Sequence, residues 1–342
     1  MKKPFLYLFL GIVVGASGLQ AARMLRSELK NRHAEKVETA RLDWQNQADA
    51  APTEKRTFSN RFSTCNDQQL LRYFNLKRNR TIKTEKAEAD LEIWNRFLSL
   101  FAAWPQGLKN YCERYVSGVY VVGQLGSSAY VLQQNDTSFV ILIDRDAMET
   151  RPNDWFNNRE RTAVDLPPSI RMAHTIEADS NNRPEFTLES LLLHELGHCI
   201  GITSGQTRKF DSSWRQLDQR SLLHGVFGVD RVKMAMDPEL REQFDGLHYY
   251  RNERLSANAY LTRLGSLRQS PFPTMYSTVN DHEYFADYFY AYVHCMLQQR
   301  PLQYVIYEED RKILEIECGV LLPHHDERRN IISGILLSLK NE

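Results

Sequence analysis

The chain has 342 residues, of which 42% are hydrophobic and 25% charged, a composition ordinary for a globular protein with a sizeable core. Its 43 lysines and arginines balance 43 aspartates and glutamates, so charge gives no basis for binding nucleic acid or an anionic membrane surface. Five cysteines are too few for a disulfide scaffold, and without a Cys-x-x-Cys pair they indicate neither a zinc ribbon nor a redox motif.

The N-terminus is typical of an export signal. Lys2 and Lys3 precede an uncharged run over residues 4–22 that includes PFLYLFLGIVVGASG. This run is nearly as long as the roughly 20 residues that span a bilayer. Residues 1–22 are therefore predicted to be either a signal peptide, cleaved after Ala16, or a retained signal anchor. Both place the body of the protein at a periplasmic or other extracytoplasmic face, and an uncleaved segment would attach it to the membrane.

The next part of the chain is predicted to be a helical stalk and linker over residues 23–62. It contains no glycine or proline before Pro52, and the sequence DAAPTEK around that proline is typical of a linker.

A helix over residues 84–104 follows, because apolar residues recur there at helical spacing and Pro105 ends the pattern. The pattern then changes to β-rich runs separated by the turn sequences LGSS and NDTS. These runs predict an antiparallel meander over residues 118–125, 128–134 and 138–144. The sequence IRMAHTIEA, residues 170–178, predicts one more strand.

The stretch LLLHELGHCIGI, residues 191–202, lies in a predicted helix over residues 188–200, with Thr187 as its N-cap and Gly201 as its stop. Residues four apart share a helix face, so His194 and His198 can bind one ion. Glu195 lies beside that face, where it can reach a water molecule on the metal. This is the HExxH pattern of two zinc ligands and a general base.

A third protein ligand is expected on a later helix over residues 283–297. The longer form of the motif would place a histidine at position 204, which is serine here. Glu283 can instead complete the coordination, and Asp287, four residues on, can hydrogen-bond the outer nitrogen of a histidine ligand. The rival third ligands are His224, His248 and His282.

The element order predicts an α+β domain over residues 63–342. In it a small mixed sheet packs on the HExxH helix and on the second, glutamate-bearing helix. Residues 204–270 are predicted to be an insert or lid, and the tail over residues 326–340 an amphipathic helix that packs on the body.

The sequence YSTVNDHEYFADYF, residues 276–289, together with HELGH, resembles the catalytic domain of anthrax lethal factor and related secreted gluzincin peptidases. The resemblance implies a zincin-like fold with one zinc per chain on the ligands named above and Glu195 as general base. It also implies that Tyr276 stabilises an oxyanion and that Asn280, part of the shared pattern, supports the site. The long insert over residues 204–270 departs from the family and leaves substrate preference open.

The predicted function is an exported zinc-dependent endopeptidase that acts on a protein or peptide. Its substrate strand is expected to pair with an edge strand over residues 170–178, near His174; the alternative for His174 is an exposed histidine with no task. Two other functions stay open: a non-catalytic, membrane-anchored binding module that contains zinc, and a metallohydrolase of cell-wall peptide amides. The oligomeric state is not indicated.

Overall fold

The computed structural model describes residues 23, 26–46, 57–64, 67–79, 81, 82, 84, 88–207, 220–230 and 233–341. The predicted signal or anchor segment over residues 1–22 lies outside these ranges. Within them, no helix has both the length and the apolar character needed to cross a membrane. Contacts divide the chain into two compact units, one within Met1–Glu54 and Asn66–Ile82, the other within Lys55–Cys65 and Lys83–Glu342.

The described residues of the first unit are mainly helical. Residues 26–46 form a helix, which agrees with the predicted stalk, and α2 (Gln68–Arg78) begins at Asp67, whose side chain accepts hydrogen bonds from two backbone amides of the first turn. Trp44 stacks on Tyr73 with ring centroids 5.6 Å apart. The sequence predicts that α2 belongs to the large domain, whereas its contacts group it with the stalk helix.

The second unit is an α+β body with a four-stranded mixed sheet. The predicted antiparallel meander is wrong: β2 pairs with β4 in parallel, and only β3 pairs with β4 antiparallel. The reason is that residues 139–143 of β4 are apolar and buried at every position, which suits a central strand covered on both faces. The spatial order is β1 (Phe62–Thr64), β2 (Val116–Val122), β4 (Ser138–Asp144) and β3 (Ala129–Asn135).

A second sheet has three strands. The predicted strand over residues 170–178 is reduced to β6 (Ile170–Met172), followed by one isolated bridge at Thr175. As expected, β6 lies at the edge of its sheet, where it pairs with β10 alone. The other two strands are β10 (Gln303–Glu308) and β11 (Arg311–Glu317).

The central helix of the body is α7 (Pro184–Thr203), which carries the HELGH sequence and is longer at both ends than predicted. Pro184 occupies the first turn, a position that suits proline. Thr187 therefore lies inside the helix, where its hydroxyl donates to the backbone oxygen of Thr150 instead of capping. Gly201 does not stop the helix. A side chain there would meet the ring of Phe285 at 2.8 Å, so the glycine permits close packing.

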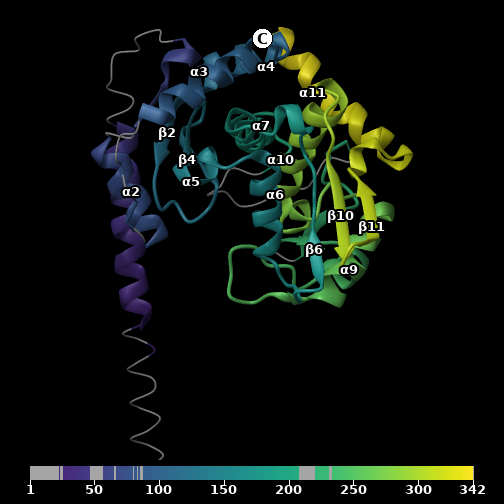
Figure 1. The fold of residues 1–342 in the computed structure, drawn as a ribbon. Coiled ribbons are helices and arrows are strands. Elements are labelled where there is room, and N and C mark those ends of the chain that lie inside the picture. Colours follow the sequence, from purple (N-terminus) through teal and green to yellow (C-terminus); the bar gives the residue numbers. More distant parts are fainter. Residues whose placement is uncertain are drawn as a thin grey trace, which may run out of the picture. The chain divides into compact units, whose positions relative to one another are not determined.

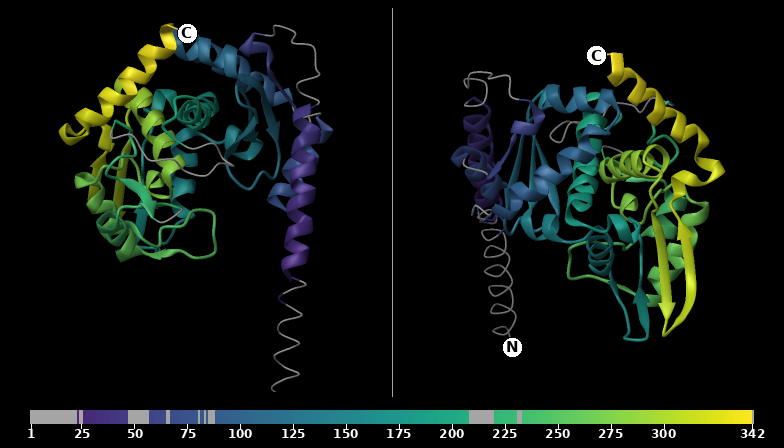
Figure 2. Two further views of the ribbon diagram at one scale, coloured as in Figure 1. Left: turned by 180° about the vertical axis from the view of Figure 1, so that it is seen from behind. Right: turned by 45° about the horizontal axis from the view of Figure 1, so that its top comes forward.

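Helix α7 packs against strands β3 and β4 and against the second site helix, α10 (Asp281–Ala291), which continues into a π-helical turn, η5 (Tyr292–Leu297). Figure 1 shows α7 end-on with α10 beside it, and Figure 2 shows the same body from two further directions. At the crossing, a Cβ on Gly197 would lie 2.7 Å from the Cα of Ala286. The absent side chain thus lets the two site helices approach closely.

The described part of the predicted insert is built into the body. Phe244, Leu247, Tyr249 and Tyr260 are buried in the core. The elements of this segment are β7 (Phe227–Asp230), β8 (Lys233–Met236), α8 (Pro238–Phe244), β9 (Leu255–Ser256), which pairs with β5 (Val164–Asp165), and α9 (Ala257–Ser266).

The remaining helices surround this core. The predicted tail helix is present as α11 (Asp326–Asn341), and it packs on α4 (Gln106–Tyr115). The helix expected over residues 84–104 is present as α3 (Glu88–Ala102). The others are α5 (Arg145–Glu149) and α6 (Pro152–Arg161), both in contact with α7.

Candidate metal centre

Three side chains from two helices meet beside the crossing of α7 and α10. His194 and His198 project from the same face of α7, and Glu283 projects from the first turn of α10. One carboxylate oxygen of Glu283 lies 3.1 Å from Nε2 of His194 and 3.4 Å from Nε2 of His198. The structure therefore brings together the three ligands predicted from sequence, and the rival histidines do not belong to this group.

The spacing of these atoms suits one metal ion. Ligand atoms bound about 2.0–2.2 Å from a tetrahedral ion stand roughly 3.3–3.6 Å from one another. The two nitrogen–oxygen distances are close to that range, and all three ligand atoms lie within 4.8 Å of each other. Side-chain exposure of 12% at His194 and 20% at Glu283 leaves one side of the group open to solvent. The group can hold a metal ion that solvent can reach.

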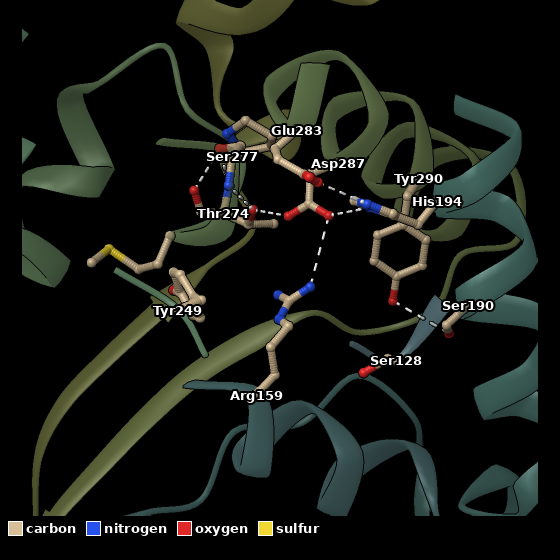
Figure 3. Close-up of polar contacts among 12 residues, drawn as sticks. Ser128, Arg159, Ser190, His194, Tyr249, Thr274, Ser277, Glu283, Asp287 and Tyr290 are labelled. Atoms are coloured by element: carbon tan, nitrogen blue, oxygen red, sulfur yellow. Dashed lines mark hydrogen bonds and ion pairs between the residues drawn. The ribbon is translucent and has the colours of Figure 1, made fainter. Parts of the chain in front are cut away.

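A second layer of contacts holds His194 from behind (Figure 3). Its Nδ1 lies 2.7 Å from a carboxylate oxygen of Asp287, as expected from the four-residue spacing of Glu283 and Asp287. The other oxygen of Asp287 accepts a hydrogen bond from the hydroxyl of Thr274. A carboxylate on the outer nitrogen fixes the ring orientation and the tautomer, which leaves Nε2 as the atom that could bind a metal.

Electrostatics follow from this arrangement. Burial opposes the charged form of His194, but hydrogen bonds and the charges of Asp287 and Glu283 outweigh it and raise the pKa of the imidazole to about 10. Burial likewise opposes the charge of Glu283, but the two histidines hold its pKa below the usual range. The carboxylates thus favour a positive charge at this position, and a metal cation can take the place of the proton on His194.

Glu195 is buried next to the ligand face of α7, at 5% exposure. Burial raises the pKa of its carboxyl, while the neighbouring His198 and His194 act in the opposite direction. No residue of the described ranges hydrogen-bonds this carboxylate. Its proton affinity and its lack of a protein partner suit a group that exchanges protons with a water molecule.

Tyr276 lies in the 3₁₀ turn η4 (Tyr276–Thr278), just before α10. Its ring centroid is 5.8 Å from that of His194 and 4.8 Å from that of Tyr249. The structure therefore brings this tyrosine to the metal-binding group, as the resemblance implies. Asn280 acts differently. Its side chain accepts hydrogen bonds from the backbone amides of His282 and Glu283, so it caps α10 and fixes where Glu283 begins the helix.

The alternative of an exposed His174 is wrong. This residue is 2% exposed, and its Nδ1 accepts a hydrogen bond from the backbone amide of Val305. Its ring packs between Phe156 and Tyr304. Burial lowers the pKa of the imidazole to about 3, so it is a neutral core residue. Strand β6 ends at Met172, two residues before His174, so this histidine is not part of the edge strand.

Three residues around the site were not predicted from sequence: Arg159, Thr274 and Tyr249. Arg159 lies 3.8 Å from Asp287 and stacks over the ring of Tyr276. No motif or helical spacing links α6 to the HELGH sequence, so nothing local in the sequence identifies this arginine.

Comparison of the chain with protein-family models, with curated proteins and with solved structures finds no match in any of the three. The resemblance to gluzincin peptidases therefore rests on the two sequence motifs.

Proposed function

We propose that this protein is an exported zinc-dependent endopeptidase. The observation that supports the proposal most is the meeting of His194, His198 and Glu283 with Glu195 beside them. Two imidazoles and one carboxylate are a typical zinc ligand set in hydrolases, and within the described residues the group has three members, which leaves a coordination position for water. Bound zinc supplies Lewis acidity that activates water and polarises a peptide carbonyl.

The protein's own residues would carry the proton transfers. Glu195 accepts a proton from the attacking water and passes it to the leaving amine. The phenol of Tyr276 donates a hydrogen bond to the oxyanion of the tetrahedral intermediate without adding a charge. Asp287 holds His194 in the orientation that the ligand set needs.

Part of a substrate peptide has space beside Tyr276. A cavity of about 390 Å³ adjoins Tyr276 and Asn280, and Tyr249, Tyr250 and His248 also line it. Aromatic and polar residues around such a cavity suit a side chain of the substrate. The edge strands β3 and β6 each have one unpaired side in their sheets, and each is a candidate for pairing with an extended peptide.

The test is cleavage of a degenerate peptide library by the zinc-loaded full chain beside its Glu195→Gln variant. We expect cuts from the wild type and at least about 10³-fold slower turnover from the variant, with zinc retained. The matched control is Glu185→Gln. Glu185 is also buried on α7, but it pairs with Arg96 and Arg183 away from the site.

The alternatives predict different results. A zinc-containing binding module would cut nothing although it is folded and zinc-loaded, and this outcome would reject the proposal. A metallohydrolase of cell-wall amides would ignore the library and release peptides from peptidoglycan fragments, again only with Glu195 intact.

A further inference from the structure

We infer that Arg159 is a positioning residue that fixes the ring of Tyr276, and thereby controls the rate of the chemical step more than substrate binding. The inference rests on the proposed function, because it assigns Tyr276 to the oxyanion. It concerns a residue that contacts no metal ligand and that no motif of the sequence includes.

Arg159 lies in the last turn of α6, with 5% of its surface exposed. Its guanidinium carbon stands 4.7 Å from the centre of the Tyr276 ring. The same guanidinium lies 3.8 Å from the oxygen of Asp287 that binds His194. Figure 3 shows the side chain extending from its helix towards Asp287. One buried cation thus contacts both Tyr276, the proposed oxyanion donor, and Asp287, the carboxylate that holds His194.

The far side of this cation is also held in place. Glu160 accepts a hydrogen bond from Arg159 at 3.2 Å. The second oxygen of Glu160 accepts hydrogen bonds from the hydroxyls of Tyr249 at 2.7 Å and Tyr260 at 2.9 Å. Because a buried charge is costly without partners, these contacts restrict where the guanidinium can lie, although its Nε has no hydrogen-bond partner among the described residues.

The network reaches Tyr276 from a second direction as well. The ring of Tyr249 meets the ring of Tyr276 edge-on, with centroids 4.8 Å apart. Arg159 covers the ring by cation–π contact. No residue of the described ranges hydrogen-bonds the Tyr276 hydroxyl, so packing on Arg159 and Tyr249 sets the ring position. The hydroxyl is left available for a substrate oxygen.

A lysine cannot replace this arginine. Lysine keeps the positive charge that Asp287 and Glu160 need, but it lacks the planar guanidinium that covers an aromatic ring and donates in fixed directions. Arg159→Lys therefore separates positioning from charge neutralisation.

The experiment compares Arg159→Lys with Arg300→Lys in the full chain. Arg300 is a matched control because its guanidinium also lies between two carboxylates, those of Glu177 and Glu189, and over an aromatic ring, that of Phe186 at 4.8 Å. None of these residues belongs to the metal-binding group. The measurements are kcat and KM, zinc affinity by chelator competition, and the position of the Tyr276 ring in a crystal structure of the metal-free variant.

We expect Arg159→Lys to lower kcat by about 10- to 100-fold with little change in KM. Arg300→Lys should leave kcat unchanged. In a Tyr276→Phe background the Arg159→Lys effect should largely disappear, because the hydroxyl through which it acts is already gone. Equal effects of the two lysine variants, or multiplying effects in the double variant, would overturn the inference. So would a loss of kcat that excess zinc restores, because it would reflect metal retention through Asp287.

Two further outcomes remain decisive. If Arg159→Lys does not fold, Glu160→Gln weakens the anchor of Arg159 without removing it, and unchanged kcat in that variant contradicts the inference. If the folded, zinc-loaded wild type cleaves nothing, the proposed function fails by itself. The ring position then decides: a displaced Tyr276 ring in Arg159→Lys supports positioning by Arg159, and an unmoved ring rejects it.

Discussion

Nδ1 of His194 and a carboxylate oxygen of Asp287 are 2.7 Å apart, although 93 positions separate the two residues in the chain. The contact joins α7 to α10, and these two helices also supply His194, His198 and Glu283. Because Asp287 also contacts Thr274 and Arg159, one buried carboxylate links three separate segments to the orientation of one imidazole.

Asp287→Asn keeps the shape of this side chain and removes its charge. We expect zinc affinity to fall about 10- to 100-fold, because the carboxylate that orients a histidine ligand and strengthens its basicity is lost. Competition with a chromophoric chelator measures this. Asp90→Asn is the control. Asp90 lies on α3, where it is buried and pairs with Arg145, so its substitution should leave zinc affinity unchanged. Equal affinity of Asp287→Asn and wild type would contradict the assignment.

Removal of a ligand should abolish stoichiometric binding. Glu283→Gln replaces the carboxylate that both histidines approach with a weak neutral donor. We expect about one zinc per wild-type chain after dialysis and much less in the variant. Elemental analysis by mass spectrometry reads this directly. Full zinc content in Glu283→Gln would show that another residue closes the site.

Tyr276→Phe removes only the hydroxyl. We expect kcat to fall about 10²- to 10³-fold with zinc retained, the usual cost of losing an oxyanion donor. Steady-state kinetics on a cleaved peptide measures it. Tyr307→Phe serves as the control because Tyr307 lies on β10, where Arg171 stacks on its ring. A Tyr276→Phe enzyme of full activity would mean that the phenol has no part in the reaction.

Gly197→Ala should separate the two site helices. The new Cβ would lie 2.7 Å from Cα and 2.8 Å from the carbonyl oxygen of Ala286, both rigid backbone atoms. Overpacking of this kind costs about 1–3 kcal/mol or more of unfolding free energy. Gly265→Ala, in α9 with open space around it, should instead add about 0.5–1 kcal/mol. Urea unfolding measures the free energy of unfolding of both variants. Equal stability of Gly197→Ala and Gly265→Ala would mean that the two helices can shift to accept the new side chain.

His174 should make the fold sensitive to acid. Its pKa is about 3 in the folded chain, against the ordinary value of 6.5, so the unfolded state binds the extra proton first. The stability contribution is complete above pH 6.5 and is lost as the pH falls towards 3, by at most about 1.4 kcal/mol per pH unit. His174→Gln should flatten the unfolding free energy of the metal-free chain between pH 6.5 and 4, relative to wild type. His224→Gln, at an exposed position, should leave this pH dependence unchanged.

The candidate metal site could be predicted from sequence because each of its two residue pairs depends on the geometry of a single helix. Four-residue spacing puts His194 and His198 on one helix face, and the same spacing pairs Glu283 with Asp287. Each pair needs only its own helix to form. The sequence also predicts the existence of α3, α7, α10 and α11, whose apolar residues recur over several turns.

The tertiary structure decided everything that depends on contacts between distant segments. Strand β4 lies between β2 and β3 because burial on both faces favours its centre position, which a run of turn sequences does not encode. Gly201 is a packing contact with Phe285, although the same residue type ends many helices. Arg159 faces Tyr276 and Asp287 only after three segments have packed together. Helical periodicity is a property of a few consecutive residues, whereas the partner of a buried charge is fixed by the whole core.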